Sequence, residues 1–170
     1  IVYSSDCKVG VESTVVTFCE NPPRLLRPGG ITAEQLREIT DIAVDKAVLS
    51  EPEKGKQVAS PGMKYKHYAP KTESFLVEGT SEKFVSFVNS KTNAVAICFR
   101  EDVEKISIPT ICYGDKADES TLAHSVFSAL REVDKMGANE VYIHAPSKSG
   151  IGLAVYNRLL RACGFKVINL

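Results

Sequence analysis

The fold of this chain is decided by three consecutive segments: Ser74-Phe-Leu-Val-Glu78, Ser81-Glu-Lys-Phe-Val-Ser-Phe-Val-Asn89 and Ala94-Val-Ala-Ile-Cys-Phe99. The first and third segments are short and apolar, which is typical of strands buried inside a sheet, whereas the second is longer and predicts a helix. Strands that alternate with helices in this way indicate a parallel sheet with helices packed against it. The sequence therefore predicts an α/β fold.

The same alternation continues toward the C-terminus. We expect helices at 118–136 and 152–162, and strands at 110–113, 141–144 and 167–169. Five apolar residues of the longer helix share one face at 3.6 residues per turn, and Gly137 is expected directly after its last turn. These five residues are Leu122, Val126, Ala129, Leu130 and Val133. Together the elements predict a three-layer sandwich around a mainly parallel sheet.

The first fifty residues contain fewer elements. We expect a helix at 33–39 and strands at 14–19, 24–27 and 44–49. Thr32 and Gln35 have the spacing of a capping box, and Leu36 and Ile39 are expected on the inward side of the helix. A piece of this size cannot bury a sufficient core, because domains below about 40 residues usually need outside support. We therefore expect the chain to be a fragment that opens within an incomplete domain.

Composition and charge exclude several classes of protein. The chain has 21 basic and 21 acidic residues, so its zero net charge gives no reason to expect direct binding to nucleic acid or to a membrane surface. No apolar run reaches the roughly 18 residues of a membrane span and the first residues lack a signal-peptide pattern, so we expect a cytoplasmic protein. The five cysteines, at 7, 19, 98, 112 and 163, include no Cys-x-x-Cys pair. We expect neither disulfides nor a metal site, and predict that these cysteines are buried.

A cationic and aromatic stretch reads Ser60-Pro-Gly-Met-Lys-Tyr-Lys-His-Tyr-Ala-Pro70. Its prolines favour turns rather than a helix or a strand. From position 54 to 71 there are five lysines and no acidic residue, a composition that is also typical of a solvated spacer between domains. A spacer has no need of the aromatic side chains, however. We interpret the stretch as a loop that closes over a phosphate-bearing ligand, because ammonium groups bind phosphate and tyrosines can hold the remainder.

Two residues of the N-terminal part could contribute to the same site. Ser13 precedes the first expected strand, and Arg27 precedes Pro28-Gly29-Gly30. A serine in this position is usually a turn former, and an arginine in a short strand is usually an exposed charge. Considered together with the cationic stretch, Arg27 could contact phosphate oxygens, while Ser13 could donate its hydroxyl to a carboxylate or phosphate.

A glycine-containing turn, Ser147-Lys-Ser-Gly150-Ile-Gly152, follows one strand and precedes a helix. Val155 replaces the third glycine of a dinucleotide-binding loop, and the chain ends before the acidic residue that such a site requires. We predict a tight turn, with an anion at the helix start left open. His144 is expected to line the same rim and is a better ligand candidate than His124, which should be solvated. No Ser-His-Asp or Cys-His arrangement is visible, so we assign no catalytic nucleophile.

Three motifs, in this order, resemble those of a known family: Gly10-Val-Glu-Ser-Thr-Val-Val16, Leu25-Leu-Arg-Pro-Gly29 and the stretch 60–70. They are similar to the long, two-domain form of threonylcarbamoyl-AMP synthase, in the YrdC family; the third motif is specific, because the short form lacks this linker. The resemblance spans the whole chain but only the C-terminal part of the family's protein. It implies an α/β remnant of a YrdC-like catalytic domain at 1–49, a linker or lid loop at 50–70 and a Rossmann-like accessory domain at 71–170.

The resemblance also implies an activity and a set of contacts. The substrates would be L-threonine, bicarbonate and ATP, with Mg²⁺ accompanying ATP, and the products threonylcarbamoyl-AMP and pyrophosphate. The adenylate would pass to downstream tRNA-modification proteins. By motif position Ser13 resembles a threonine contact and Arg27 an ATP-phosphate contact. The lid residues over ATP would be Tyr65, the first choice, with Lys64, His67 and Tyr68.

One position departs from the family pattern. Thr17 stands where the family often carries an acid, so a role of that acid is not carried over to this chain, while Ser13 and Arg27 are unaffected. Because the main pocket would belong to the missing N-terminal half, we expect the fragment to be inactive alone. The alternative is a non-catalytic regulatory module that binds a ligand or partner at the sheet edge around His144 and Gly150.

Overall fold

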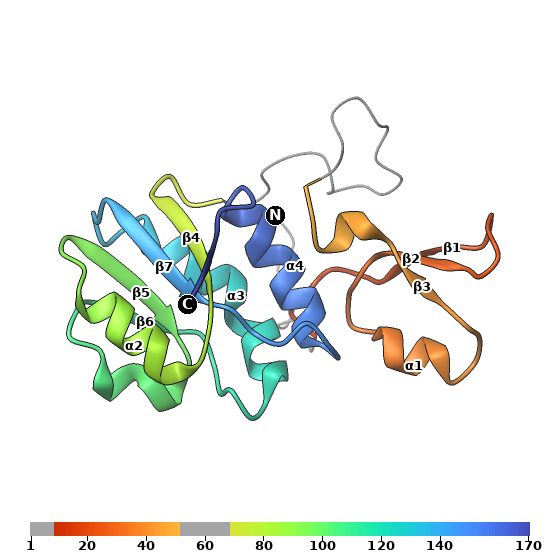
Figure 1. Cartoon of the computed structure of the whole chain (residues 1–170), viewed down its shortest axis with the longest axis horizontal. Coiled ribbons are helices and arrows are strands. Elements are labelled where there is room, and N and C mark those ends of the chain that lie inside the picture. The colour runs from red at the N-terminus through yellow and green to blue at the C-terminus, as the bar shows by residue number, and fades with distance from the viewer. Residues whose placement is uncertain (1–8, 52–68) are drawn as a thin grey trace, which may run out of the picture.

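The structure is a computed structural model that describes residues 9–51 and 69–170. Within these ranges the chain forms two sheets, one in an N-terminal unit (residues 9–51) and one in a C-terminal unit (residues 69–170) (Figure 1). None of the helices in the described part is long and apolar enough to cross a membrane.

The C-terminal unit contains a five-stranded sheet in which every pairing is parallel. The order across the sheet is β6-β5-β7-β4-β8. Its elements in chain order are β4 (Glu73–Glu78), α2 (Ser81–Asn89), β5 (Ala94–Cys98), η2 (Arg100–Lys105), β6 (Thr110–Cys112), α3 (Glu119–Val133), β7 (Glu140–His144), α4 (Gly152–Ala162) and β8 (Val167–Asn169). The predicted alternation of strands and helices is confirmed.

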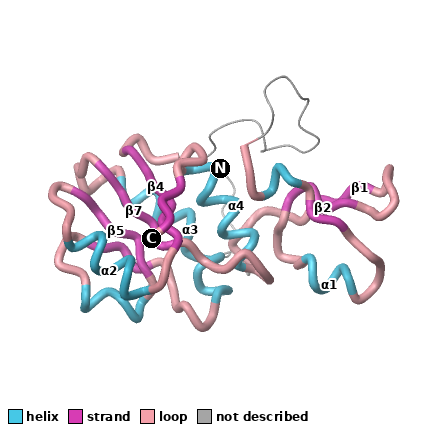
Figure 2. The backbone as a smooth tube through the Cα atoms, in the orientation of Figure 1, coloured by secondary structure: helices cyan, strands magenta, loops and turns pink. Residues whose placement is uncertain are grey.

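Helices cover both faces of this sheet, which gives the expected three layers (Figure 2). Strand β5 is buried along its whole length: Val95 and Ile97 point toward the core under α3 and α4, while Ala96 and Cys98 point toward the core under α2. A strand covered on both faces is expected to be apolar throughout, because neither set of side chains meets water. The continuous apolar run that suggested a buried strand is explained by this position.

Helix α3 is confirmed in its face and shortened at its end. All five residues predicted to share one face are buried. Asp118 caps the start by accepting a hydrogen bond from the backbone N–H of Ser120. The helix ends at Val133 and turns occupy the next residues, so Gly137, although its φ is +67°, lies beyond the position expected for it.

The N-terminal unit holds three short strands, β1 (Val15–Thr17), β2 (Arg24–Arg27) and β3 (Ala43–Val44), with α1 (Ala33–Arg37) and η1 (Lys46–Val48). Strand β2 pairs antiparallel with β1 and parallel with β3. The capping box of Thr32 and Gln35 is present. Because α1 ends at Arg37, the helical spacing does not extend to Ile39, whose side chain is 86% exposed, so its predicted inward position is wrong.

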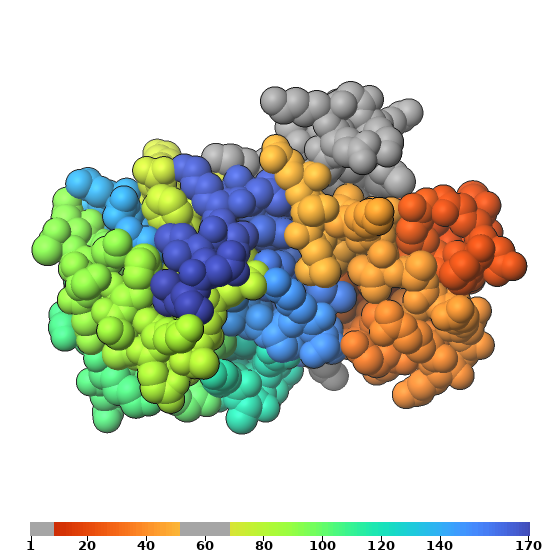
Figure 3. Space-filling view, in the orientation of Figure 1, coloured from red at the N-terminus to blue at the C-terminus, as the bar shows by residue number. Residues whose placement is uncertain are grey.

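Helix α4 lies between the two units. All of its residues are buried, because it packs on the sheet with one side and against the N-terminal unit with another. Leu153 of α4 completes the apolar cluster of the N-terminal unit, which also contains Leu25, Ala33, Ile42 and Val48. Figure 3 shows the surfaces of the two units in direct contact. The N-terminal unit therefore depends on α4 for part of its core.

The four cysteines within the described residues differ in burial. Cys98 and Cys163 are buried as predicted, and burial raises the pKa of the Cys98 thiol to about 12. Cys19 and Cys112 are exposed, so the prediction of burial is wrong for these two. Cys19 follows β1, and Cys112 ends β6 at the edge of the sheet, where fewer neighbours cover a side chain. Cys7 lies outside the described residues.

Candidate functional site

The structure brings Ser13 and Arg27 into direct contact. Arg27 ends β2 and faces Val15 across the antiparallel pairing with β1, next to an irregularity between Val15 and Val16. The Arg27 guanidinium donates from Nε to the Ser13 carbonyl and from Nη2 to the Ser13 hydroxyl, both at 3.0 Å. Two side chains that the sequence placed 14 positions apart thus form one polar group.

The turn after β2 fixes this contact from the other side. A Cβ atom on Gly29 would lie 2.2 Å from the Glu12 carbonyl oxygen and 2.4 Å from the Thr14 backbone nitrogen, so only glycine allows this approach. Thr14 adds a second connection, because its hydroxyl donates to the Ile31 carbonyl at 2.7 Å and accepts from the Ile31 N–H at 3.1 Å. The Pro28-Gly29-Gly30 turn therefore holds the backbone around Ser13.

This geometry determines what the pair can bind. A guanidinium can only donate, so the Ser13 hydroxyl acts as the acceptor toward Arg27 and can turn its own proton toward another group. Ser13 is exposed and Arg27 is half-buried, which leaves the serine accessible to a ligand. A positive guanidinium beside a hydroxyl donor suits a carboxylate or a phosphate.

The four candidate lid residues, Lys64, Tyr65, His67 and Tyr68, lie outside the described residues. The chain is described again from Ala69 onward. There the backbone N–H of Lys71 donates to Asp134, just after α3, at 2.7 Å. This hydrogen bond fixes the point at which the linker enters the C-terminal unit.

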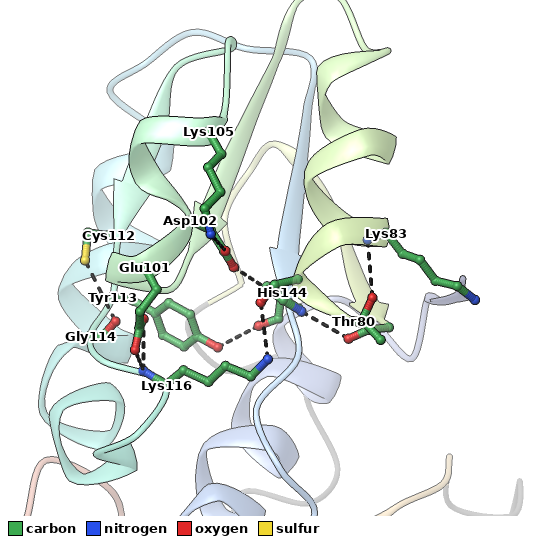
Figure 4. Close-up of polar contacts among 12 residues, drawn as sticks. Thr80, Lys83, Glu101, Asp102, Lys105, Cys112, Tyr113, Gly114, Lys116 and His144 are labelled. Carbon is green, nitrogen blue, oxygen red and sulfur yellow. Dashed lines mark hydrogen bonds and ion pairs between the residues drawn. The ribbon is translucent and has the colours of Figure 1, made fainter.

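His144 does not line a rim that a ligand could reach, so its prediction as a ligand contact is wrong. Its side chain is 1% exposed and lies between the rings of Phe84 and Phe99, with ring centroids 4.3 and 4.5 Å away. Nε2 donates to the Gly79 carbonyl at 3.2 Å, and Nδ1 lies 3.6 Å from Asp102 Oδ2 (Figure 4). Burial lowers the pKa of His144, although the Asp102 carboxylate opposes this shift. The histidine thus joins the end of β7 to η2 and to the residue after β4.

Sequence reasoning missed Asp102 and Tyr113, which support His144. Asp102 is completely buried in η2, where Lys105 donates to its Oδ1 at 3.3 Å. Tyr113 donates its hydroxyl to the His144 carbonyl at 2.6 Å, and burial raises its pKa well above the usual value. The charged run Arg-Glu-Asp-Val-Glu-Lys at 100–105 resembles a solvated loop, and only its Val103 indicated that one side faces inward.

The turn at 147–152 is filled by an acidic side chain of the protein itself. Glu119 accepts from the Ser147 backbone N–H at 2.8 Å and from its hydroxyl at 2.9 Å. A Cβ atom on Gly152 would lie 2.3 Å from the Glu119 carboxylate, so the carboxylate sits at the start of α4. The place where a phosphate loop would hold its anion is thus taken by Glu119, in agreement with a tight turn rather than a dinucleotide site.

Comparison with known proteins places these features in a family. Residues 31–164 match the family "Threonylcarbamoyl-AMP synthase, C-terminal domain". The threonylcarbamoyl-AMP synthase of Pyrococcus abyssi is 34% identical over 183 residues, covering 100% of this chain and 51% of the relative. That of Bacillus subtilis is 35% identical over 176 residues, covering 99% and 49%. The chain spans about half the length of these relatives.

Solved structures agree with the sequence relatives. The crystal structure of P. abyssi Sua5 complexed with L-threonine has a TM-score of 0.73 and 32% identity, covering 96% of this chain and 48% of that one. A variant of P. abyssi Sua5, with a histidine and the next residue, a tyrosine, both changed to alanine, has a TM-score of 0.76 with the same coverage. The chain therefore belongs to the threonylcarbamoyl-AMP synthase family and carries its C-terminal domain.

Proposed function

We propose that this chain acts as part of an enzyme that makes threonylcarbamoyl-AMP and pyrophosphate from L-threonine, bicarbonate and ATP. The observation that carries the proposal is the contact between Ser13 and Arg27, which joins a hydroxyl donor and a guanidinium on one exposed surface. The rest of the enzyme would be the N-terminal half of the relatives, which this chain does not include. The chain alone would be inactive.

In this proposal Ser13 contacts the carboxylate of threonine and Arg27 contacts the phosphates of ATP. The P. abyssi relative, which matches nearly the whole of this chain, was solved with L-threonine, and this supports a threonine site in the protein to which the chain belongs. A carboxylate and a triphosphate are both negatively charged, so a guanidinium and a neighbouring hydroxyl can bind the two groups side by side.

The proposed reaction needs positioning more than a nucleophilic residue. A carbamate oxygen formed from threonine and bicarbonate attacks the α-phosphorus of ATP, the new P–O bond forms, and the bond to pyrophosphate breaks. The negative charge that develops is stabilised by fixed donors such as the Arg27 guanidinium. Mg²⁺ would arrive with the phosphates of ATP; in residues 9–51 and 69–170 no three acidic, histidine or cysteine side chains are grouped to hold a metal.

The linker completes the proposal as a lid. Its lysine and aromatic residues would cover the nucleotide and exclude water from the carbamate and the mixed anhydride. One P. abyssi relative was solved with an adjacent histidine and tyrosine replaced by alanine, and His67 and Tyr68 form the single His-Tyr pair of this sequence. With Lys64 and Tyr65 they are the proposed ATP contacts of the lid.

The domain division follows the two sheets. We propose a catalytic-domain remnant at 1–49, the lid linker at 50–70 and an accessory domain at 71–170, because the separate sheets lie on either side of residues 52–68. A cytoplasmic location and transfer of the product to tRNA-modification proteins belong to the same proposal. The alternative of a regulatory site around His144 and Gly150 has lost support, since His144 is buried and Glu119 occupies the turn.

Pyrophosphate release tests the proposal, with ATP, threonine and bicarbonate supplied to this chain and to the chain extended by the N-terminal half of its relatives. Activity is expected only after extension. Arg27→Ala should lower kcat/KM for ATP by about a hundredfold, as expected for removal of a charged donor from a reacting phosphate. Ser13→Ala should raise the KM for threonine by about tenfold, the value of one hydrogen bond.

A matched control lies on the same strand. Arg24 begins β2 and pairs with Glu20 and Asp45 rather than with Ser13, so Arg24→Ala removes a guanidinium from β2 without changing the proposed site. Its kinetic constants should stay within about threefold of the parent. Equal losses in the Arg24→Ala and Arg27→Ala proteins, or unchanged kinetics after Arg27→Ala and Tyr65→Phe, would contradict the proposal.

A further inference from the structure

The C-terminal unit holds the segment that carries Ser13. This Ser13 segment, residues 10–14, begins at Gly10, where a Cβ atom would lie 2.4 Å from the Ala123 carbonyl oxygen and 2.5 Å from the Cα of His124 on α3. The φ of Gly10 is +76°, so both its conformation and its close approach to α3 require glycine. The next residue, Val11, packs against the main core of the C-terminal unit. The residues that lead into Ser13 thus run along the surface of α3.

The following residue forms an ion pair across the boundary between the units. Glu12 pairs with Arg158 of α4, and the Arg158 side chain is 5% exposed whereas that of Glu12 is 35% exposed. The Arg158 guanidinium also lies over the ring of Phe127, with Cζ 4.6 Å from the centroid. Burial lowers the pKa of Arg158 to about 10, and Arg161 contributes to this shift. A buried guanidinium strongly favours an opposite charge beside it, so Glu12 is fixed in place.

We propose that Arg158 is a positioning residue for the threonine contact. Glu12 is held by Arg158 from the C-terminal unit, and the adjacent Ser13 is held by Arg27 from β2. Fixing Glu12 limits the movement of the Ser13 backbone, so the Ser13 hydroxyl is already in place before threonine binds. The free energy of threonine binding is then not reduced by the cost of ordering the segment. This inference rests on the proposed function and gives the accessory domain a task in it.

Arg161 provides a contrast on the same helix. It lies one turn after Arg158 and is equally buried, but its Nη2 donates to the Ala47 carbonyl at 2.8 Å. Arg161 therefore holds η1 near the end of the N-terminal unit, whereas Arg158 pairs with Glu12 of the Ser13 segment. If Arg158 merely helped the units to dock, the two arginines should have the same effect. If Arg158 positions Ser13, replacing Arg158 and replacing Arg161 should affect different segments of the chain.

Hydrogen exchange of this chain tests the separation without any activity measurement. Arg158→Met keeps most of the side-chain volume and leaves Glu12 partly hydrated, so the fold should survive. We expect amide exchange in residues 9–17 to become at least tenfold faster, while residues 45–49 stay unchanged. Arg161→Met should give the opposite pattern. The proposal fails if Arg158→Met leaves 9–17 unaffected, or if both variants loosen both segments equally.

A second pair of variants, Glu12→Gln and the double variant Glu12→Gln/Arg158→Met, separates loss of the ion pair from loss of overall stability. Glu12→Gln removes the charge from the half-exposed partner and leaves the Arg158 guanidinium buried without it, so it should destabilise the chain more than Arg158→Met. The double variant should recover stability relative to Glu12→Gln, because no buried charge is then left alone. It should nevertheless keep the fast exchange of residues 9–17. A double variant with normal protection of that segment would overturn the proposal.

Kinetics of the chain extended by the N-terminal half of its relatives connect the positioning to function. Arg158→Met should raise the KM for threonine by about tenfold, with the KM for ATP and kcat within about twofold, and Arg158→Lys should fall between Arg158→Met and the parent. Arg161→Met should leave the threonine KM unchanged. If Ser13→Ala raises this KM and Arg158→Met does not, the positioning role is wrong. If Ser13→Ala itself has no effect, the proposed function has failed instead.

Discussion

The two units of this protein differ in how they are stabilised and in what they carry. The C-terminal unit has a five-stranded parallel sheet with an apolar core on each face. The N-terminal unit has strands of 3, 4 and 2 residues and a single apolar cluster that includes Leu153 from α4. Ser13 and Arg27, two of the residues proposed to bind substrate, lie in the N-terminal unit, which has the smaller core. Stability and proposed chemistry are therefore separated, and α4 connects them.

The connection is visible in two leucines of α4. Leu159 is completely buried in the core between α4 and the sheet, whereas Leu153 is buried in the cluster of the N-terminal unit. One helix thus serves two cores with two of its sides. Truncating either leucine changes one core at a time, so the pair can show whether the N-terminal unit depends on the C-terminal unit and not the reverse.

The largest effect is expected for Leu159→Ala. Removing this side chain from the main core leaves a cavity and should lower the free energy of unfolding by about 3 to 5 kcal/mol. Because the N-terminal unit is completed by α4, both units should lose protection together. Denaturant unfolding combined with hydrogen exchange measures this. Retained protection in residues 9–51 while residues 69–170 open would show that the N-terminal unit stands alone and would break the comparison.

A smaller and one-sided effect is expected for Leu153→Ala. The cost should be about 2 kcal/mol, because the cluster around Leu153 is small and can relax around the missing atoms. Limited proteolysis should then cut the chain within residues 9–51 before it cuts the C-terminal unit. If the C-terminal unit is cleaved first, or both at the same rate, α4 does not separate two cores in the way described.

The pH dependence of stability should come from the C-terminal unit through His144. The pKa of His144 is lowered by burial and by the nearby Lys116, and raised by Gly79 and Asp102, with burial the largest cause. The unfolded chain then binds a proton more readily than the folded one, so the free energy of unfolding should fall as the pH drops below about 6.5. One proton contributes at most about 1.4 kcal/mol per pH unit.

His144→Gln tests this origin. The variant should show a flatter decline of the free energy of unfolding between pH 6.5 and 5 than the parent, measured by denaturant titrations at several pH values. His124 is exposed on α3 and provides the matched change, so His124→Gln should follow the parent. A decline that is identical in the His144→Gln protein and the parent would assign the pH dependence to other groups.

The regular part of the fold could be predicted from sequence, because its signals are local. The five residues on the face of α3 and the capping box of Thr32 and Gln35 depend on neighbours within a few positions, and both are present. The environment of His144 could not be predicted in this way. Its two aromatic neighbours come from positions 84 and 99, and only the packing of α2 and the loop after β5 brings them to the end of β7.

The candidate site was partly predictable for the same reason. Ser13 and Arg27 could each be selected by residue type and by proximity to a strand end, but their contact depends on the irregular pairing of β1 with β2 and on the close approach of Gly29. Likewise, the pairing of Glu12 with Arg158 joins positions that are far apart in the chain. A single sequence contains no local signal for contacts of this kind.

The smallest effect on stability is expected for a substitution of Ile39, a residue of the N-terminal unit that lies outside its apolar cluster. Sequence spacing placed Ile39 and Leu36 on one inward face, whereas Leu36 packs against the N-terminal cluster and Ile39 is 86% exposed. Ile39→Ser should therefore change the free energy of unfolding by less than about 0.5 kcal/mol, as for other surface substitutions. Leu36→Ser should lower the free energy of unfolding by more than Ile39→Ser, because it removes apolar contact from a small cluster. Equal costs for the two changes in denaturant unfolding would mean that α1 continues to Ile39 and that the N-terminal unit buries more than its short strands suggest.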